Sequence, residues 1–269
     1  MKTLYIAATR QHAGKTTVCL GLFHAAESRG YSTCFIKPVG QRYIVEDHQE
    51  VDEDAALFKH ALAADGPLKQ LSPVTIPRGF TRRYINDPDP DAIHGPIREA
   101  VDLLARDHDL AIVEGTGHAG VGSVIDASNA EVARRLKAQC IIVSGGGIGR
   151  CIDEICLNRA LFDQCGVPVI GAVINKVYQE KYDKVSETVC RGLNRLGTRC
   201  LGALPYKREL TYPTMRHIQE EFGLEVLCGG KQLDNPIQDI IVAAMEPQNM
   251  INYVTVGTLV VVPGDRVDN

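Results

Sequence analysis

Apolar runs recur along most of the chain and alternate with segments of helical pattern. The runs that read as strands are residues 3–8, 33–39, 110–115, 140–146, 168–177 and 200–206. The intervening segments carry apolar residues at helical spacing, as in TTVCLGLFHAAESRG and NAEVARRLKA. Continuous apolar strands alternating with helices are typical of a parallel sheet that is covered by helices on both faces. We therefore predict an α/β fold with its ligand site at the carboxyl ends of the strands.

Two regions depart from this alternation. The stretch 71–97 is rich in proline and has no clear period, which predicts a long excursion or lid, or else an ordinary irregular connection. After residue 206 the sequence PTMRHIQEEFGLEVLCGG reads as a helix and then a strand, and DIIVAAM and GTLVVVPGDRVDN are further strand candidates. We expect one domain over residues 1–206 and a small α/β unit over 207–269. This unit stops where a strand should turn, so we expect it to be truncated.

Composition narrows the class of ligand. The 269 residues carry a net charge of −4, which argues against a dominant nucleic-acid or membrane partner. The apolar run at the N-terminus is too short for a signal peptide, and none reaches the length of a membrane span. The nine cysteines include no Cys-x-x-Cys pair. An odd number of cysteines without a secretory signal favours reduced thiols in a cytoplasmic protein.

The stretch LYIAATRQHAGKTTVCLGL, from Leu4 to Leu22, runs from an apolar strand through a short loop into a helical pattern. Phosphate binding needs converging backbone N–H groups, a helix N-terminus and a cation. Here Gly14 permits close approach, Lys15 supplies the charge, and the Thr16 hydroxyl is a candidate magnesium ligand. This context predicts a phosphate-binding loop, the alternative being a chance Gly-Lys-Thr at a helix start. The candidate nucleotide-binding residues are Thr9, Arg10, Gln11, His12, Ala13, Gly14, Lys15, Thr16 and Thr17.

The strict form of this motif has a glycine where the chain has Thr9. Thr9 with an intact Lys15-Thr16 pair resembles the loop of the dethiobiotin synthetases. That family shares a class of P-loop proteins with the cobyrinic acid amidases and the partition ATPases. Many members carry a second lysine at the position of Arg10. The resemblance implies that Arg10 contacts phosphate across a homodimer interface, whereas the alternative is a solvated loop arginine.

The second strand ends in FIKPVG, which places Lys37 beside the phosphate loop. The same Lys-Pro-Val occurs in dethiobiotin synthetases, and it implies that Lys37 helps to hold the γ-phosphate and the substrate carbamate. The alternative is a surface lysine whose stem covers apolar side chains. Lys15 and Lys37 are therefore the candidate catalytic residues.

Two acids are candidate magnesium ligands together with Thr16. Glu114 ends the buried strand DLAIVEG, where a carboxylate is costly without a cation, and the alternative is a solvated loop acid. Asp54 aligns, by resemblance, with an aspartate that the family uses at the metal. Capping and the helix dipole alone also favour an acid at this helix start. Glycines at 115, 117, 120 and 122 predict a mobile or tightly turned loop after Glu114.

The fifth strand ends in VINKV, so Asn175 and Lys176 lie at the same edge of the sheet. A guanine-binding motif would be Asn-Lys-x-Asp, but the fourth residue here is Tyr178. In dethiobiotin synthetases the matching asparagine contacts adenine, and a loop after a Leu-Pro pair covers the base. The resemblance thus implies that Asn175, Pro205 and Tyr206 bind ATP in preference to GTP.

The resemblance covers residues 1–206 and is weaker in the 71–97 stretch. A better match is the dethiobiotin-synthetase-like domain that precedes a DRTGG domain in long phosphotransacetylases and in stand-alone proteins. The tail AAMEPQN…GTLVVVPGDRVDN resembles part of that DRTGG domain. The phosphate site with Lys15 and Lys37, by its resemblance to dethiobiotin synthetases, implies a Mg-ATP-dependent ligase that phosphorylates a carboxylate or carbamate of an unidentified small-molecule acceptor. The alternative is a regulatory ATP-binding module that acts through its DRTGG-like tail.

Overall fold

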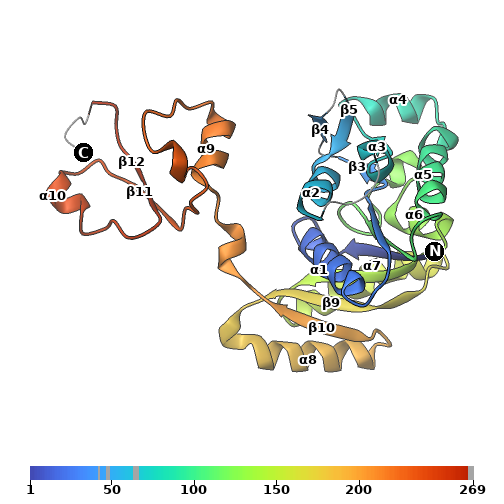
Figure 1. Ribbon diagram of the computed structural model, residues 1–269. Coiled ribbons are helices and arrows are strands. Elements are labelled where there is room, and N and C mark those ends of the chain that lie inside the picture. The colour runs from blue at the N-terminus through green and yellow to red at the C-terminus, as the bar shows by residue number, and fades with distance from the viewer. Residues whose placement is uncertain (42, 47–48, 63–66, 266–269) are drawn as a thin grey trace. The chain divides into compact units, whose positions relative to one another are not determined.

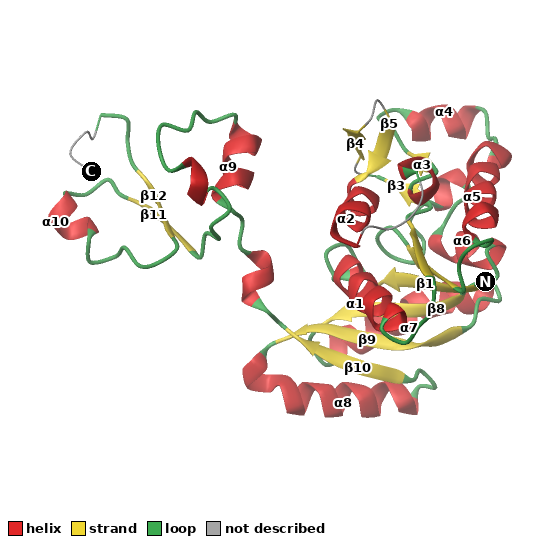
Figure 2. Ribbon diagram, viewed as in Figure 1, coloured by secondary structure: helices red, strands yellow, loops and turns green. Residues whose placement is uncertain are grey.

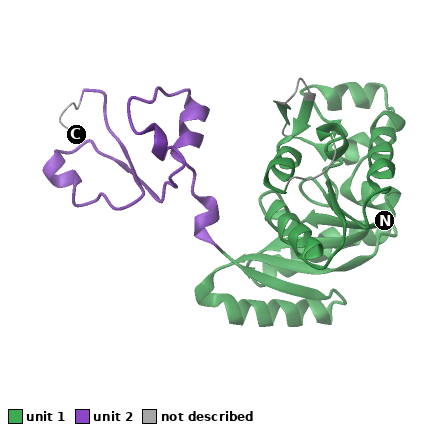
Figure 3. Ribbon diagram, in the orientation of Figure 1, with its two compact units in different colours: residues 1–206 green, residues 207–269 purple. Residues whose placement is uncertain are grey.

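The computed structural model describes residues 1–265 except 42, 47–48 and 63–66. The chain divides into two compact units, Met1–Tyr206 and Lys207–Asn269 (Figure 3). In the described part of the first unit, six parallel strands form the central sheet in the order β10-β9-β8-β1-β7-β2 (Figure 1). These strands are β1 (Lys2–Ala8), β2 (Thr33–Ile36), β7 (Leu110–Glu114), β8 (Gln139–Gly145), β9 (Val169–Val177) and β10 (Cys200–Pro205). Each overlaps an apolar run of the sequence, and the predicted parallel α/β fold is confirmed.

Helices cover both faces of this sheet (Figure 2). Successive side chains of a strand point to opposite faces. Accordingly, Tyr5 and Ala7 of β1 join one buried cluster, and Ile6 and Ala8 join the other. Buried residues of α5 (Pro90–Leu104), α6 (Asn129–Arg135), α7 (Gly149–Gln164) and α8 (Tyr182–Arg195) belong to the first cluster. Buried residues of α1 (Lys15–Glu27), α2 (Glu53–Leu62) and α3 (Leu68–Leu71) belong to the second. The helices cover the faces of the sheet and not its edge, so loops follow the carboxyl ends of the strands.

The 71–97 stretch is mostly helical, so the alternative of an ordinary irregular connection is wrong, and the long excursion or lid stays a prediction. It contains β6 (Val74–Thr75), α4 (Phe80–Asn86) and the start of α5. Pro90 lies in the first turn of α5, where a proline is favoured, and the Asp89 side chain caps this helix by accepting from the Ala92 N–H. The buried residues Ile93, Ile97, Ala100 and Leu104 repeat with helical spacing. The prolines concealed this pattern.

Smaller strands complete the first unit. β3 (Val39–Gly40) pairs with β6, and β4 (Tyr43–Glu46) forms an antiparallel pair with β5 (Gln49–Asp52). In the described residues, short 3₁₀ helices are η1 (Ser123–Ile125) and η2 (Gln179–Lys181) in this unit and η3 (Arg208–Thr211) and η4 (Gly230–Gln232) in the second. No helix in the described residues is long and apolar enough to cross a membrane.

The second unit holds α9 (Met215–Phe222), β11 (Asp239–Val242), α10 (Pro247–Met250) and β12 (Thr258–Val261), with β11 and β12 paired in parallel. The strand expected directly after α9 is not formed by residues 224–228. Gly223 ends the helix in the left-handed conformation, and Leu227 is 86% exposed. Among the described residues of this unit, the buried hydrophobic side chains are Ile237 and Ala243.

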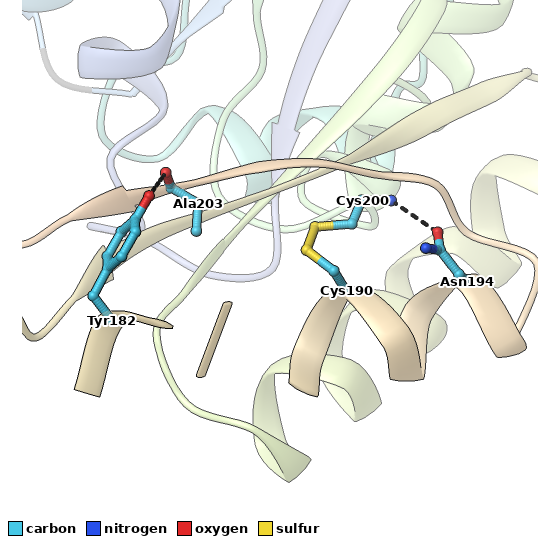
Figure 4. The surroundings of a disulfide bond; sticks show 5 residues. All are labelled: Tyr182, Cys190, Asn194, Cys200 and Ala203. Atoms are coloured by element: carbon cyan, nitrogen blue, oxygen red, sulfur yellow. Dashed lines mark hydrogen bonds between the residues drawn. A yellow bond between two sulfur atoms is a disulfide. The ribbon is translucent and has the colours of Figure 1, made fainter. Parts of the chain in front are cut away.

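A disulfide joins Cys190 of α8 to Cys200 of β10 (Figure 4). The expectation of reduced thiols is therefore wrong for this pair. The other described cysteines are free: Cys19, Cys34, Cys140, Cys151, Cys156, Cys165 and Cys228. The Tyr182 hydroxyl also donates to the Ala203 carbonyl at 2.7 Å, and the Cys200 N–H donates to Asn194 Oδ1 at 3.3 Å. The disulfide and these two hydrogen bonds attach α8 to the edge strand.

Candidate functional site

The phosphate loop lies between β1 and α1, at the centre of the sheet. β1 ends at Ala8 and α1 begins at Lys15, with Gly14 in the left-handed conformation before it. β1 pairs with β7 and β8 on its two sides, so the ends of three strands meet at the loop. The strand, loop and helix N-terminus that phosphate binding requires are therefore present.

Thr9 attaches the loop to the neighbouring strand and helix. Its side chain is buried, its hydroxyl donates to Glu154 Oε2 at 2.9 Å, and it lies 3.2 Å from Ser144 Oγ. Its N–H donates to the Val143 carbonyl at 3.0 Å. A glycine would keep only the backbone contact. The departure from the strict motif thus supplies side-chain bonds that hold the start of the loop to β8 and α7.

Four side chains from separate segments form one charged cluster at the start of α1. Lys37 Nζ lies 2.6 Å from Asp54 Oδ2 and 3.0 Å from Glu114 Oε1. The Thr16 hydroxyl lies 3.1 Å from Asp54 Oδ1 and 3.1 Å from Glu114 Oε1. The structure therefore brings together the residues that the sequence nominated separately as catalytic and as metal ligands.

Burial and mutual charge set the protonation of this cluster. Burial by itself lowers the pKa of Lys37. The charges of Glu114 and Asp54 raise it by a larger amount, so the pKa of Lys37 lies above its usual range. Burial raises the pKa of Glu114 more than Lys37 lowers it. Burial raises the pKa of Asp54, but the charge and hydrogen bond of Lys37, together with hydrogen bonds to Thr16 and Glu114, lower it by more, so the net pKa is lowered. Burial lowers the pKa of Lys15. Lys37 is therefore held as a cation.

The donor set fits a magnesium ion. Thr16, Asp54 and Glu114 offer only oxygen atoms, which Mg²⁺ prefers. Within the described residues, Glu114 Oε2 is buried and has no hydrogen-bond partner. A buried carboxylate oxygen without a partner is costly, and a cation would satisfy it. Lys37 already engages Asp54 Oδ2 and Glu114 Oε1, so a bound cation would share or replace its contacts.

The residues expected to bind the base lie at the ends of β9 and β10. Asn175 is buried, and its Nδ2 donates to the Ala13 carbonyl at 3.0 Å. The Tyr206 N–H donates to the Val177 carbonyl at 2.8 Å, and the ring of Tyr206 packs edge-on against Tyr178 with centroids 5.5 Å apart. Pro205 pairs with Val177 at the last position of β10. The Asn175 amide thus faces the phosphate loop, and its contact with adenine stays a prediction.

The remaining nominated loop residues are mostly exposed. Arg10, Gln11, His12 and Thr17 are exposed, whereas Ala13 is buried. The Arg10 guanidinium lies near Gly145, where a Cβ atom would be 3.0 Å from it. The contact of Arg10 with phosphate across a dimer interface stays a prediction.

A cavity beside Glu114 is a feature that the sequence did not indicate. It has a volume of about 70 Å³, and its polar lining includes Gln41, Thr81 and Thr116. Glu114 is the charged side chain among the described residues that line it. The rest of the lining is largely aliphatic. A cavity of this size admits a small group rather than a large ligand.

Asn129 shapes this cavity and was missed in the sequence. Its Oδ1 accepts hydrogen bonds from the Tyr5 hydroxyl at 2.8 Å and from the Thr116 N–H at 2.9 Å. Its Nδ2 donates to the carbonyls of Thr116 and His118, both at 2.6 Å. Asn129 therefore fixes the loop that follows Glu114. In the sequence it was indistinguishable from an ordinary residue at a helix start.

A parallel sheet with a Gly-Lys-Thr loop between its central strand and first helix defines a P-loop protein. The chain belongs to the AAA_26 family, described as an AAA domain, whose model matches residues 2–214. A DRTGG domain model matches residues 217–269. The resemblance to a dethiobiotin-synthetase-like P-loop domain followed by a DRTGG domain is confirmed.

Relatives of two kinds match this chain. A phosphate acetyltransferase of Pseudomonas putida is 28% identical over 279 residues, which cover 100% of this chain and 39% of the relative. The ATP-dependent dethiobiotin synthetase BioD of Pseudomonas aeruginosa is 29% identical over 217 residues, covering 78% of this chain and 92% of the synthetase. The chain thus spans about two-fifths of the length of the acetyltransferase.

A solved structure also shares the fold. The MinC:MinD cell division protein complex of Aquifex aeolicus matches with a TM-score of 0.51 and 14% identity, covering 78% of this chain and 84% of the other. At this identity the likeness shows the fold alone.

Proposed function

We propose that the first unit binds Mg-ATP and transfers the γ-phosphoryl group to a carboxylate or carbamate oxygen of a small acceptor, as in a dethiobiotin-synthetase-type ligase. The observation that carries this proposal is the cluster of Thr16, Lys37, Asp54 and Glu114 at the N-terminus of α1. The match to BioD over 92% of that enzyme supports it.

Each residue of the cluster has a role in this proposal. The loop N–H groups and Lys15 bind the phosphates. Thr16, Asp54 and Glu114 would hold Mg²⁺, which when bound neutralises charge on the phosphate oxygens. Lys37, held as a cation by the two carboxylates, stabilises the charge that develops on the transferring phosphoryl group. To do so it exchanges part of its contact with Asp54 and Glu114 for a phosphoryl oxygen.

The reaction consists of two displacements. In the first, an acceptor carboxylate oxygen bonds to the γ-phosphorus while the bond to the β-phosphate oxygen breaks, which gives an acyl or carbamoyl phosphate and ADP. In the second, an amine nitrogen bonds to the carbonyl carbon, the bond to the phosphate oxygen breaks, and the amine proton goes to solvent. The products are an amide or cyclic urea, ADP and phosphate.

The cavity beside Glu114 is our candidate site for the reacting end of the acceptor, because its volume admits a small group and not a whole ligand. Its aliphatic lining suits a short hydrocarbon chain, and Gln41, Thr81 and Thr116 supply hydrogen-bonding groups. The described lining residues include no lysine, arginine or histidine. An acceptor carboxylate in this cavity would therefore be hydrogen-bonded by neutral groups and would lie beside Glu114, whose charge Lys37 balances.

A regulatory ATP-binding module is the second candidate. The DRTGG match over residues 217–269 and the full-length match to part of a phosphate acetyltransferase favour it. In this alternative, ATP binding sets the state of a homodimer and the second unit transmits it to a partner. Arg10, which is exposed, would then contact the phosphates bound by the other subunit.

The deciding experiment measures ADP release from Mg-ATP with and without 7,8-diaminopelargonate plus bicarbonate. Lys15→Ala serves as the blank, because it removes the charge of the phosphate loop. Strong stimulation by the two small molecules would establish a dethiobiotin synthetase. ATP binding without stimulation would favour the regulatory module or another acceptor. Stimulation by a partner protein alone would favour the regulatory module.

A further inference from the structure

One face of α7 is bonded to two loops of the candidate site. Glu154 and Asn158 are four residues apart in this helix, so their side chains lie on the same face. The Thr9 hydroxyl, at the start of the phosphate loop, donates to Glu154 Oε2 at 2.9 Å. The Ala119 N–H, in the loop that follows Glu114, donates to Asn158 Oδ1 at 2.7 Å. One turn of α7 therefore contacts both loops.

The two positions of α7 are also connected to each other. Asn158 Nδ2 donates to the Glu154 carbonyl at 2.8 Å, which fixes the orientation of the amide that accepts from Ala119. Arg150 Nε lies 2.6 Å from Glu154 Oε1, and Thr9 is bonded to Oε2. Burial raises the pKa of Glu154, but hydrogen bonds from Arg150 and Thr9 and the charges of nearby arginines lower it by more. Glu154 therefore accepts the Thr9 bond as a carboxylate, and a charged acceptor strengthens this bond.

The loop that Asn158 holds borders the cavity beside Glu114. Four of its residues line that cavity: Gly115, Thr116, Val121 and Gly122. Ala119 lies between them in sequence and is buried, and its N–H has Asn158 as its partner. A buried N–H without a partner is costly. Asn158 therefore determines where the middle of this loop lies.

We propose that Glu154 and Asn158 are positioning residues that couple the phosphate loop to the loop over residues 115–122. The phosphates of a bound nucleotide immobilise the phosphate loop and, with it, Thr9. Glu154 and Asn158 then hold Ala119 more firmly, so the cavity is ordered before an acceptor enters. Binding that orders one end of a bonded network lowers the cost of ordering the other end. This inference rests on the proposed nucleotide site and not on the identity of the acceptor.

A direct route between the two loops runs through Glu114. Its Oε1 lies 3.1 Å from the Thr16 hydroxyl, and Gly115 follows it in the chain. A magnesium ion held there would order residues 115–122 without α7. Thr9 allows the two routes to be distinguished, because its hydroxyl contacts Glu154 and Ser144.

The test measures hydrogen–deuterium exchange of the backbone amides in residues 115–122, with and without Mg-ADP. Calorimetry sets the ADP concentration for each variant, so that proteins of equal occupancy are compared. In the wild-type protein we expect Mg-ADP to slow exchange in this segment by about fivefold. Thr9→Val keeps the shape of the side chain but lacks the hydroxyl, and we expect it to show slowing of less than about twofold. Thr9→Ser, which retains a hydroxyl, should keep the wild-type response.

Glu154→Leu is the second variant, because it removes the same bond from the side of α7. It should also lose the response to Mg-ADP. Asp153→Leu, at the neighbouring exposed acid of α7, is the matched control and should keep the response.

Three outcomes would count against the proposals. A full response in both Thr9→Val and Glu154→Leu would overturn the inference in favour of the route through Glu114. A wild-type protein that binds Mg-ADP without slower exchange in residues 115–122 would also overturn it. A wild-type protein that binds no nucleotide would contradict the proposed function instead.

Discussion

The two sides of the candidate site consist of different kinds of side chain. The proposed phosphate side consists of charged groups bonded to one another, with the buried Lys37 between the partly buried Asp54 and the buried Glu114. The proposed acceptor side is a small cavity with a largely aliphatic lining, shaped by the loop that Asn129 fixes. Phosphate chemistry requires particular residue types in fixed places, whereas a cavity requires only a shape that many side chains can supply. The first side is therefore specific for its chemistry, and the second is where related proteins can differ.

The largest change in ATP affinity that this comparison predicts follows from replacing Lys15. Lys15→Ala should raise the Kd of Mg-ATP by about 100-fold, because the variant loses a charge-assisted hydrogen bond to phosphate. Calorimetry measures the affinity, and circular dichroism checks that the fold is retained. An unchanged affinity in a folded variant would contradict the assignment of the phosphate loop.

Lys37→Met should separate binding from turnover on the phosphate side. We expect the Kd of Mg-ATP to change by less than about fivefold and the turnover rate to fall by about 100-fold, the size of effect seen when one transition-state donor is removed. Equal losses in binding and turnover would show that Lys37 acts on the bound ATP and not on the transferring group.

The same variant should also change the pH dependence of stability. Removing Lys37 leaves two carboxylates without their cation, so the free energy of unfolding should fall by about 3 kcal/mol at pH 8. In the wild-type protein the lowered pKa of Asp54 gives stability that is present above its usual pKa and lost as the pH falls through the lowered value. Acid also neutralises the uncompensated carboxylates of the variant. The difference between the two proteins should therefore narrow from pH 8 to pH 5, as urea unfolding would measure, and a difference that widened would exclude this ion pair as the cause.

A substitution in the cavity should affect only the acceptor side. Val124 lines the cavity and is half exposed, so Val124→Phe adds volume there with little cost to the fold. We expect the KM of the acceptor to rise about 10-fold while the Kd of Mg-ATP stays unchanged, because the lost contact area is worth roughly 1–2 kcal/mol. Leu157→Phe, at an exposed position of α7, is the control of similar bulk. A matching loss of ATP affinity would mean that the two sides are not separable.

The phosphate side was predictable from sequence because its residues stand at the ends of apolar strands. Lys37 follows β2 and Glu114 ends β7, and the carboxyl ends of parallel strands meet at one edge of the sheet. The cavity was not predictable, because Thr81 lies in α4, a helix that the neighbouring prolines concealed. Asn129 gave no signal, since its partner Tyr5 is far away in sequence and its bond to the Thr116 N–H depends on how the loop after Glu114 folds.

The disulfide and the orientation of Asn175 could not be predicted from the sequence either. Pairing Cys190 with Cys200 depends on how α8 packs along β10, which cysteine spacing does not reveal. For Asn175, the position at a strand end was visible, but the hydrogen bond to Ala13 depends on the left-handed backbone of Gly14 and Lys176. Local pattern thus located this residue without determining which part of the nucleotide it serves.

The smallest predicted effect separates the base from the phosphates. Tyr206 packs edge-on against Tyr178 at the ends of β10 and β9, and Tyr206→Leu keeps most of the apolar volume but removes the aromatic face. Stacking of an aromatic ring is worth about 1 kcal/mol beyond its buried area, so the Kd of Mg-ATP should rise about fivefold. The affinity for inorganic tripolyphosphate, which has no base, should stay unchanged when it is measured by competition with a fluorescent ATP analogue. If both ligands weakened equally, Tyr206 would act through the phosphate loop and not through contact with the base.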